Sequence, residues 1–135
     1  MSDPIVTNHA HHVTLTVCDV SRSKQFYTDL FNFQFVTDFG PRAILSNGNL
    51  LLILTPPPDP DQAHLDDRFD ENRVGLDHLS LSVEAHADLE AAIRTFDERG
   101  VSHGAIKSLE PFGIAVLAFR DPDNIQIELT APLAA

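Results

Sequence analysis

The chain has 135 residues, enough for one ordinary domain with little left for a second independent fold. Nine Lys and Arg stand against twenty Asp and Glu, and the formal net charge of -11 argues against a nucleic-acid partner. The single cysteine, Cys18, cannot form an internal disulfide, and the apolar runs fall far short of the roughly 20 residues that cross a bilayer. We therefore expect a cytoplasmic protein with no nucleic-acid partner and no membrane association.

Residues 12–17 alternate between an apolar and a polar face, which predicts a half-buried strand. Its polar face carries His12, Thr14 and Thr16. Residues 78–83 repeat this pattern 66 positions later, with a polar face made of His78, Ser80 and Ser82. The chain therefore contains an internal repeat.

An amphipathic helix is expected after each of these strands. Ser21 and Ser23 are candidate N-caps of the first helix, and Asp88 and Gly100 mark the ends of the second. Further strands are expected at residues 33–39, 43–45 and 50–55 in the first half, and at 101–106, 114–119 and 125–130 in the second. Both halves thus predict the order β-α-β-β-β.

The last strands of the two halves also match, at an offset of 75, and place Ile53 where the second half has Glu128. Residues 56–74 contain four of the prolines and many acidic residues, which favours a linker or flap. We predict a single domain over residues 1–135, with a first module at about 8–55, the linker at 56–74 and a second module at about 75–131.

Three residues on the polar faces are candidate metal ligands. His12, His78 and Glu128 come from three different strands and are surrounded by small hydroxyl residues. A lone strand histidine is usually structural, but two at equivalent positions of a repeat, joined by a carboxylate, favour a divalent transition metal. A buried Glu128 also needs a cation or hydrogen-bond donors.

These motifs resemble the vicinal oxygen chelate superfamily, which includes glyoxalase I, bleomycin-resistance proteins, fosfomycin-resistance thiol transferases and extradiol dioxygenases. The resemblance spans nearly the whole chain, through the segments 12–19, 23–27, 75–83 and 119–129. It implies an α+β fold in which two βαβββ modules form an open, barrel-like sheet, often completed in a homodimer. It also places His12, His78 and Glu128 on metal-ligand positions.

The resemblance to individual branches is incomplete. Glyoxalase I has a second glutamate where this chain has Ile53, so methylglyoxal isomerisation is not expected. The three-ligand set is more similar to the thiol transferases and the dioxygenases. However, the potassium loop of the former is absent, and the only tyrosine, Tyr27, lies in a predicted helix rather than late in the chain.

Two functional hypotheses follow. The first is an enzyme that uses one divalent ion (iron, manganese, nickel or zinc) to bind a small substrate through adjacent oxygens; whether it is a lyase, a thiol transferase or a dioxygenase is left open. The side chains expected to contact this substrate are Thr14, Thr16, Ser80, Ser82, Gln126 and Arg120. The second is a metal-free binding protein, similar to the bleomycin-resistance proteins, that sequesters a cationic small molecule.

Three further residues have alternative interpretations. Arg120 is expected either to clamp an anionic substrate group or to pair with a surface carboxylate. His11 is a less favoured substitute for His12 as a ligand. His103 is either a proton shuttle or a structural residue.

Overall fold

The structure is a computed structural model that describes residues 3–133. The described residues form two compact units, one up to residue 63 and the other from residue 64. Each unit contains one four-stranded mixed sheet and one long helix. Among residues 3–133, no helix combines the length and the apolar character that a membrane span requires.

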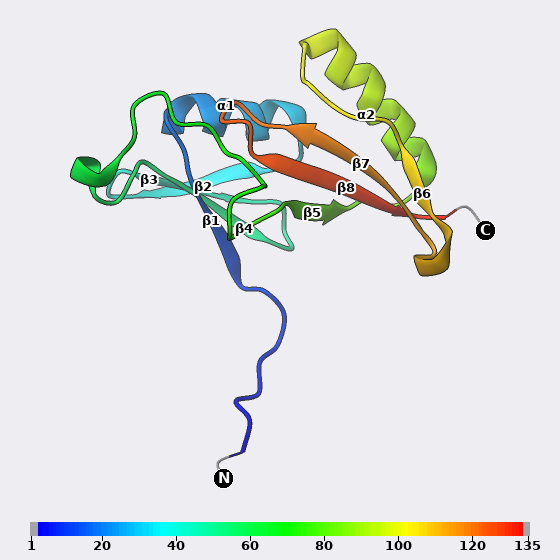
Figure 1. Ribbon diagram of the computed structural model, residues 1–135, viewed down its shortest axis with the longest axis horizontal. Helices are drawn as coiled ribbons and strands as arrows, with labels where there is room; N and C mark the ends of the chain where they lie inside the picture. Colours follow the sequence, from blue (N-terminus) through cyan, green and yellow to red (C-terminus); the bar gives the residue numbers. More distant parts are fainter. Residues whose placement is uncertain (1–2, 134–135) are drawn as a thin grey trace. The chain divides into compact units, whose positions relative to one another are not determined.

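The first unit contains β1 (His12–Thr16), α1 (Val20–Leu30), β2 (Gln34–Phe39), β3 (Arg42–Ser46) and β4 (Leu51–Thr55). The strand order is β1-β4-β3-β2, with β1 parallel to β4 and the other neighbours antiparallel (Figure 1). A short 3-10 helix, η1 (Pro60–Gln62), follows within the predicted linker.

The second unit repeats this arrangement with β5 (Leu79–Ser82), α2 (His86–Arg99), β6 (Lys107–Leu109), β7 (Ile114–Arg120) and β8 (Gln126–Pro132). A 3-10 helix, η2 (Glu110–Phe112), separates β6 from β7. The strand order β5-β8-β7-β6 matches that of the first sheet (Figure 1). The predicted α+β fold of two βαβββ modules is therefore confirmed, and neither sheet is closed on itself.

Each helix covers the apolar face of its own sheet. In the first unit, Tyr27 of α1 is buried over a sheet face that includes Leu45 and Leu52. In the second unit, the ring of Phe96 in α2 lies 4.7 Å from that of Phe119 in β7. Burying each large side chain contributes about 1.5–3 kcal/mol, so these two contacts fix which face of each sheet remains open.

The first helix begins earlier than its serines suggest. The N-cap is Asp19, whose carboxylate accepts a hydrogen bond of 3.1 Å from the backbone N–H of Arg22. Ser23 is fully buried inside the helix, and Ser21 lies exposed in its first turn. The prediction of a serine cap was wrong because an aspartate two residues upstream satisfies the free N–H groups of the first turn.

The strand predicted at 101–106 is also different. Only His103 forms a bridge there, to Phe119, and the regular strand β6 begins at Lys107. Residue 104 is a glycine whose N–H donates to Ala118 O, so the edge of β7 is paired in two short pieces. The sequence of this short stretch predicted one continuous strand and could not show this break.

His103 links this edge to α2. Its Nε2 lies 2.7 Å from Asp97 Oδ1, and its Nδ1 lies 2.6 Å from the carbonyl oxygen of Gly104. Both partners are acceptors, so the protonated imidazolium satisfies both contacts and the neutral ring satisfies one. His103 therefore lies on the helix-covered face of the sheet, where its contacts are structural.

We predict that Asp19→Ala lowers the free energy of unfolding by about 1 kcal/mol, because the helix loses its capping acceptor. Urea unfolding monitored by circular dichroism measures this loss. Ser21→Ala is the matched control and is expected to be nearly neutral. A larger loss from Ser21→Ala than from Asp19→Ala would contradict the assignment of the cap.

We predict that the contribution of His103 to stability depends on pH. The Asp97 carboxylate, followed by the Gly104 carbonyl, raises the pKa of His103 above its usual 6.5. Because the folded pKa is the higher one, the stabilisation is fully present below pH 6.5 and is lost as the pH rises through the folded pKa. The wild type is expected to be more stable than Asp97→Asn at pH 5, and this difference in unfolding free energy is expected to shrink as the pH rises to 9. A difference that grows with pH would contradict the role of the Asp97 contact.

Candidate functional site

The open face of the first sheet carries the polar side chains of β1. His12, Thr14 and Thr16 are exposed, whereas Leu15 on the opposite face is buried. The Nδ1 atom of His12 lies 2.9 Å from Nδ1 of its neighbour His11. The predicted phase of this strand is therefore confirmed, with His12 at its first residue.

The open face of the second sheet brings two predicted ligands together. His78 immediately precedes β5, and its Nε2 lies 3.5 Å from Oε1 of Glu128 in β8. This approach follows from the parallel pairing of the two strands, in which Ser80 is opposite Glu128. In the first sheet, the equivalent pair is Thr14 and Ile53, as the offsets of 66 and 75 predict.

Glu128 is mostly shielded from solvent, with 18% of its side chain exposed. Thr130, two residues along the same strand, donates a hydrogen bond of 3.2 Å to Glu128 Oε1. The hydroxyl of Ser80 is in turn hydrogen-bonded to that of Thr130. A half-buried carboxylate is thus oriented by one neutral donor, beside an imidazole, on a face lined with hydroxyl groups.

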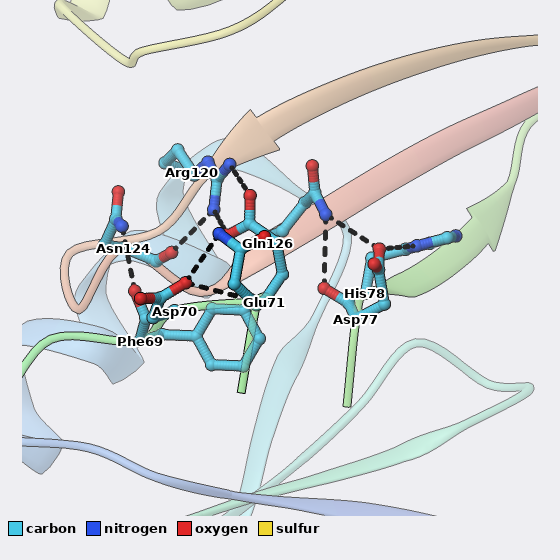
Figure 2. A network of polar contacts seen from close by, with 9 residues as sticks. Phe69, Asp70, Glu71, Asp77, His78, Arg120, Asn124 and Gln126 are labelled. Atoms are coloured by element: carbon cyan, nitrogen blue, oxygen red, sulfur yellow. Dashed lines mark hydrogen bonds and ion pairs between the residues drawn. The ribbon is translucent and has the colours of Figure 1, made fainter. Parts of the chain in front are cut away.

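Asp77 was missed by the sequence analysis. Its carboxylate Oδ1 lies 2.8 Å from Nδ1 of His78 and accepts a hydrogen bond of 3.0 Å from the amide of Gln126 (Figure 2). Strand alternation would place consecutive side chains on opposite faces, but Asp77 and His78 lie just before β5, where alternation does not apply. The only sequence signal for Asp77 was its position next to the predicted ligand His78.

Arg120 is paired with a carboxylate of its own chain. Its two terminal nitrogens each lie 2.8 Å from one oxygen of Glu71, and Nη1 also donates to the carbonyl oxygen of Asn124 (Figure 2). The Arg120 guanidinium lowers the pKa of Glu71 to about 2, and Glu71 raises that of Arg120. Arg120 pairs across the ladder with Gln126, so it lies at the end of the face that carries Glu128.

Residues 66–71, an acidic part of the 56–74 segment predicted as a linker or flap, are hydrogen-bonded to the turn between β7 and β8. The backbone N–H of Phe69 donates to Asp123 O, and the Asn124 amide donates to Phe69 O. A surface hollow of about 390 Å³ lies along this segment. Its lining residues are Asp66, Asp67, Arg68, Phe69, Asp70, Glu71, Arg73 and Asn124.

Each unit contributes separately to the predicted ligand set. Across residues 3–133, no three His, Cys, Asp or Glu side chains are grouped closely enough to hold a metal ion. The second unit presents the pair His78 and Glu128, and the third predicted ligand, His12, belongs to the first unit. The pair places one imidazole nitrogen and one carboxylate oxygen close together among hydroxyl groups.

Comparisons with known proteins agree with this architecture. The protein YwkD of Bacillus subtilis (strain 168) is 27% identical over 126 residues, which cover 88% of this chain and 93% of YwkD. The crystal structure of a glyoxylase/bleomycin resistance protein/dioxygenase domain from Frankia sp. EAN1pec is 30% identical, with a TM-score of 0.74 over 94% of this chain and 99% of that chain.

A lactoylglutathione lyase from Agrobacterium tumefaciens shares the fold, with a TM-score of 0.72 at 19% identity over 93% of this chain and 94% of that chain. The family model of the Glyoxalase/Bleomycin resistance protein/Dioxygenase superfamily matches residues 9–129. The chain therefore belongs to this superfamily, the vicinal oxygen chelate proteins.

Proposed function

We propose that the protein is a divalent-metal-dependent enzyme that acts on a small substrate bound through two adjacent oxygens. The observation that carries this proposal is the approach of His78 Nε2 to Glu128 Oε1, 3.5 Å apart on a face lined with hydroxyl groups. An imidazole and a carboxylate on such a face are typical ligands of a catalytic transition metal.

The donor set fits such an ion. Two ligand atoms bonded to one ion at about 2.1 Å, at angles of about 90–110°, lie roughly 3.0–3.4 Å apart. The separation of 3.5 Å between Nε2 and Oε1 is close to this span, so little movement of either side chain is needed. Glu128 has one neutral donor, Thr130, which leaves most of its charge available to a cation.

We propose His12 as the third ligand, because it occupies in the first unit the repeat position of His78. It would come from the same chain or, in the homodimer that we also propose, from the partner subunit. The two modules, residues 8–55 and 75–131, would then work as one domain joined by the 56–74 linker. Proteins of this superfamily commonly form dimers and bind small molecules.

The bound ion would act as a Lewis acid toward charge that develops on a substrate oxygen. The hydroxyl groups of Thr14, Thr16, Ser80 and Ser82 are exposed and would orient the substrate by hydrogen bonds. Gln126 and Arg120 lie further along the same face of the second sheet, where the Gln126 carbonyl oxygen and an Arg120 released from Glu71 would contact polar and anionic groups.

The candidate reactions are those of the superfamily branches. A lactoylglutathione lyase and the fosfomycin resistance protein FosX from Mesorhizobium loti share the fold, the latter with a TM-score of 0.67 at 16% identity over 94% of this chain and 93% of that chain. Ile53 faces the open side beside Thr14 and supplies no fourth ligand. A three-ligand thiol transferase or dioxygenase is therefore favoured over a four-ligand isomerase.

One observation favours a second candidate function. The net charge of -11 and the carboxylates along the 390 Å³ hollow are suited to a cationic ligand. A metal-free protein that sequesters a cationic small molecule would use this charge without the His78 and Glu128 pair.

We predict that protein purified without chelators contains one divalent ion per set of His12, His78 and Glu128. Substituting any of these three by Ala is expected to weaken the metal affinity by more than about 100-fold, because even the loss of an outer-shell contact costs about 10–100-fold. Elemental analysis and competition with a chromophoric chelator measure both quantities.

His64→Ala is the matched control, since His64 is exposed and distant in sequence from the three ligands. Unchanged metal content in His78→Ala would contradict the proposed site. Protein that carries no metal, and binds a cationic ligand equally well as wild type and as His78→Ala, would establish sequestration instead.

A mixed dimer of His12→Ala and Glu128→Ala subunits reports where His12 comes from: one intact site remains if it comes from the partner subunit.

A further inference from the structure

The side chain of Asp77 lies between a predicted ligand and a strand residue. Its Oδ1 is 2.8 Å from His78 Nδ1, and the Gln126 amide donates both to that oxygen, at 3.0 Å, and to the Asp77 carbonyl oxygen, at 3.2 Å (Figure 2). Asp77 is otherwise open to solvent, with 67% of its side chain exposed. Gln126 therefore provides a second contact that restrains this exposed carboxylate, besides the contact with His78.

The contact defines which nitrogen of the ring carries the proton. Both neighbours of the ring are carboxylates, which only accept hydrogen bonds, but Asp77 Oδ1 is the nearer one, at 2.8 Å against 3.5 Å for Glu128 Oε1, so the single N–H of a neutral His78 is best placed at Nδ1. The other nitrogen, Nε2, then presents its lone pair toward Glu128, which is the form that binds a metal ion.

The first unit has an equivalent contact. His11, which precedes His12 as Asp77 precedes His78, places its own Nδ1 2.9 Å from Nδ1 of His12. In both halves of the repeat, the preceding side chain contacts Nδ1 of the histidine, and Nε2 lies on the opposite side of the ring. Two different residue types at one repeat position thus make the same contact.

We propose that Asp77, held by Gln126, is a positioning residue that fixes the ring and the tautomer of His78 before any metal ion binds. The inference rests on the proposed function, since it assigns His78 Nε2 to the ion. It also gives the Gln126 amide a role in the protein itself, alongside the substrate contact proposed for its carbonyl oxygen. A carboxylate that accepts the distal N–H of a ligand histidine strengthens metal binding by about 10–100-fold.

Removing Asp77 should reverse the tautomer. Without an acceptor at Nδ1, the proton of a neutral His78 would move to Nε2, where the Glu128 carboxylate accepts it. The lone pair needed by the ion would then face away from Glu128. Asp77→Asn keeps an acceptor oxygen and should retain most of the original tautomer.

Long-range ¹H–¹⁵N spectra of the metal-free full chain at pH 8.5 measure the tautomer of His78 directly. We expect Nδ1–H in the wild type and in Asp77→Asn, and Nε2–H in Asp77→Ala. The affinity for Zn²⁺ is expected to fall about 10–100-fold in Asp77→Ala and by less in Asp77→Asn. Glu84→Ala, which removes one exposed charge of the same unit, controls for net charge and should change neither quantity.

The outcomes separate this inference from the proposed function. Wild-type His78 in the Nε2–H form, or a tautomer unchanged in Asp77→Ala, would overturn the role of Asp77 even if metal binds. If the wild type and both Asp77 variants show the expected tautomers but the wild type binds no Zn²⁺, the role of Asp77 is supported and the metal site is refuted. Asp77 lies at the surface, so Asp77→Ala is expected to fold. A circular dichroism spectrum that matches the wild-type spectrum checks this.

Discussion

The candidate site depends on the register between β5 and β8. Their parallel pairing sets Ser80 opposite Glu128 and so brings the carboxylate to the side chain that precedes β5, His78. Side chains alternate between faces along a strand, so a slip of one residue would turn Glu128 into the core under α2 and expose Ile127. The hydrophobic face of β8, fully buried at Ile127, therefore keeps Glu128 on the opposite face.

The same alternation between faces, together with the repeat, explains why so much of the fold could be predicted. Alternation along residues 12–17 and 78–83 is a local pattern, and the helix-covered sides of both strands agree with it. The repeat then aligned distant segments without any knowledge of the structure. Its prediction that Ile53 and Glu128 are equivalent is confirmed, because Ile53 pairs with Thr14 as Glu128 pairs with Ser80.

Sequence reasoning missed two kinds of feature: the choice between two nearby capping residues, and contacts made by residues in loops. Asp19 and Ser21 are both good caps, and only the start of the helix decides between them. Glu71 pairs with Arg120, and Asp77 with Gln126, across 49 residues in each case. Neither Glu71 nor Asp77 lies in a regular strand, so periodicity gives no information about where their side chains point.

The two halves share a backbone plan but differ in the chemistry of their open faces. Ile53 makes the first sheet apolar at the position where the second has a carboxylate, so the ligand set that we propose takes His12 from the first half and both His78 and Glu128 from the second. The contact at histidine Nδ1 exists in both halves, through His11 and Asp77. An imidazole can donate or accept a hydrogen bond, whereas a carboxylate only accepts one, so the contact at Nδ1 has a fixed direction in the half that carries Glu128.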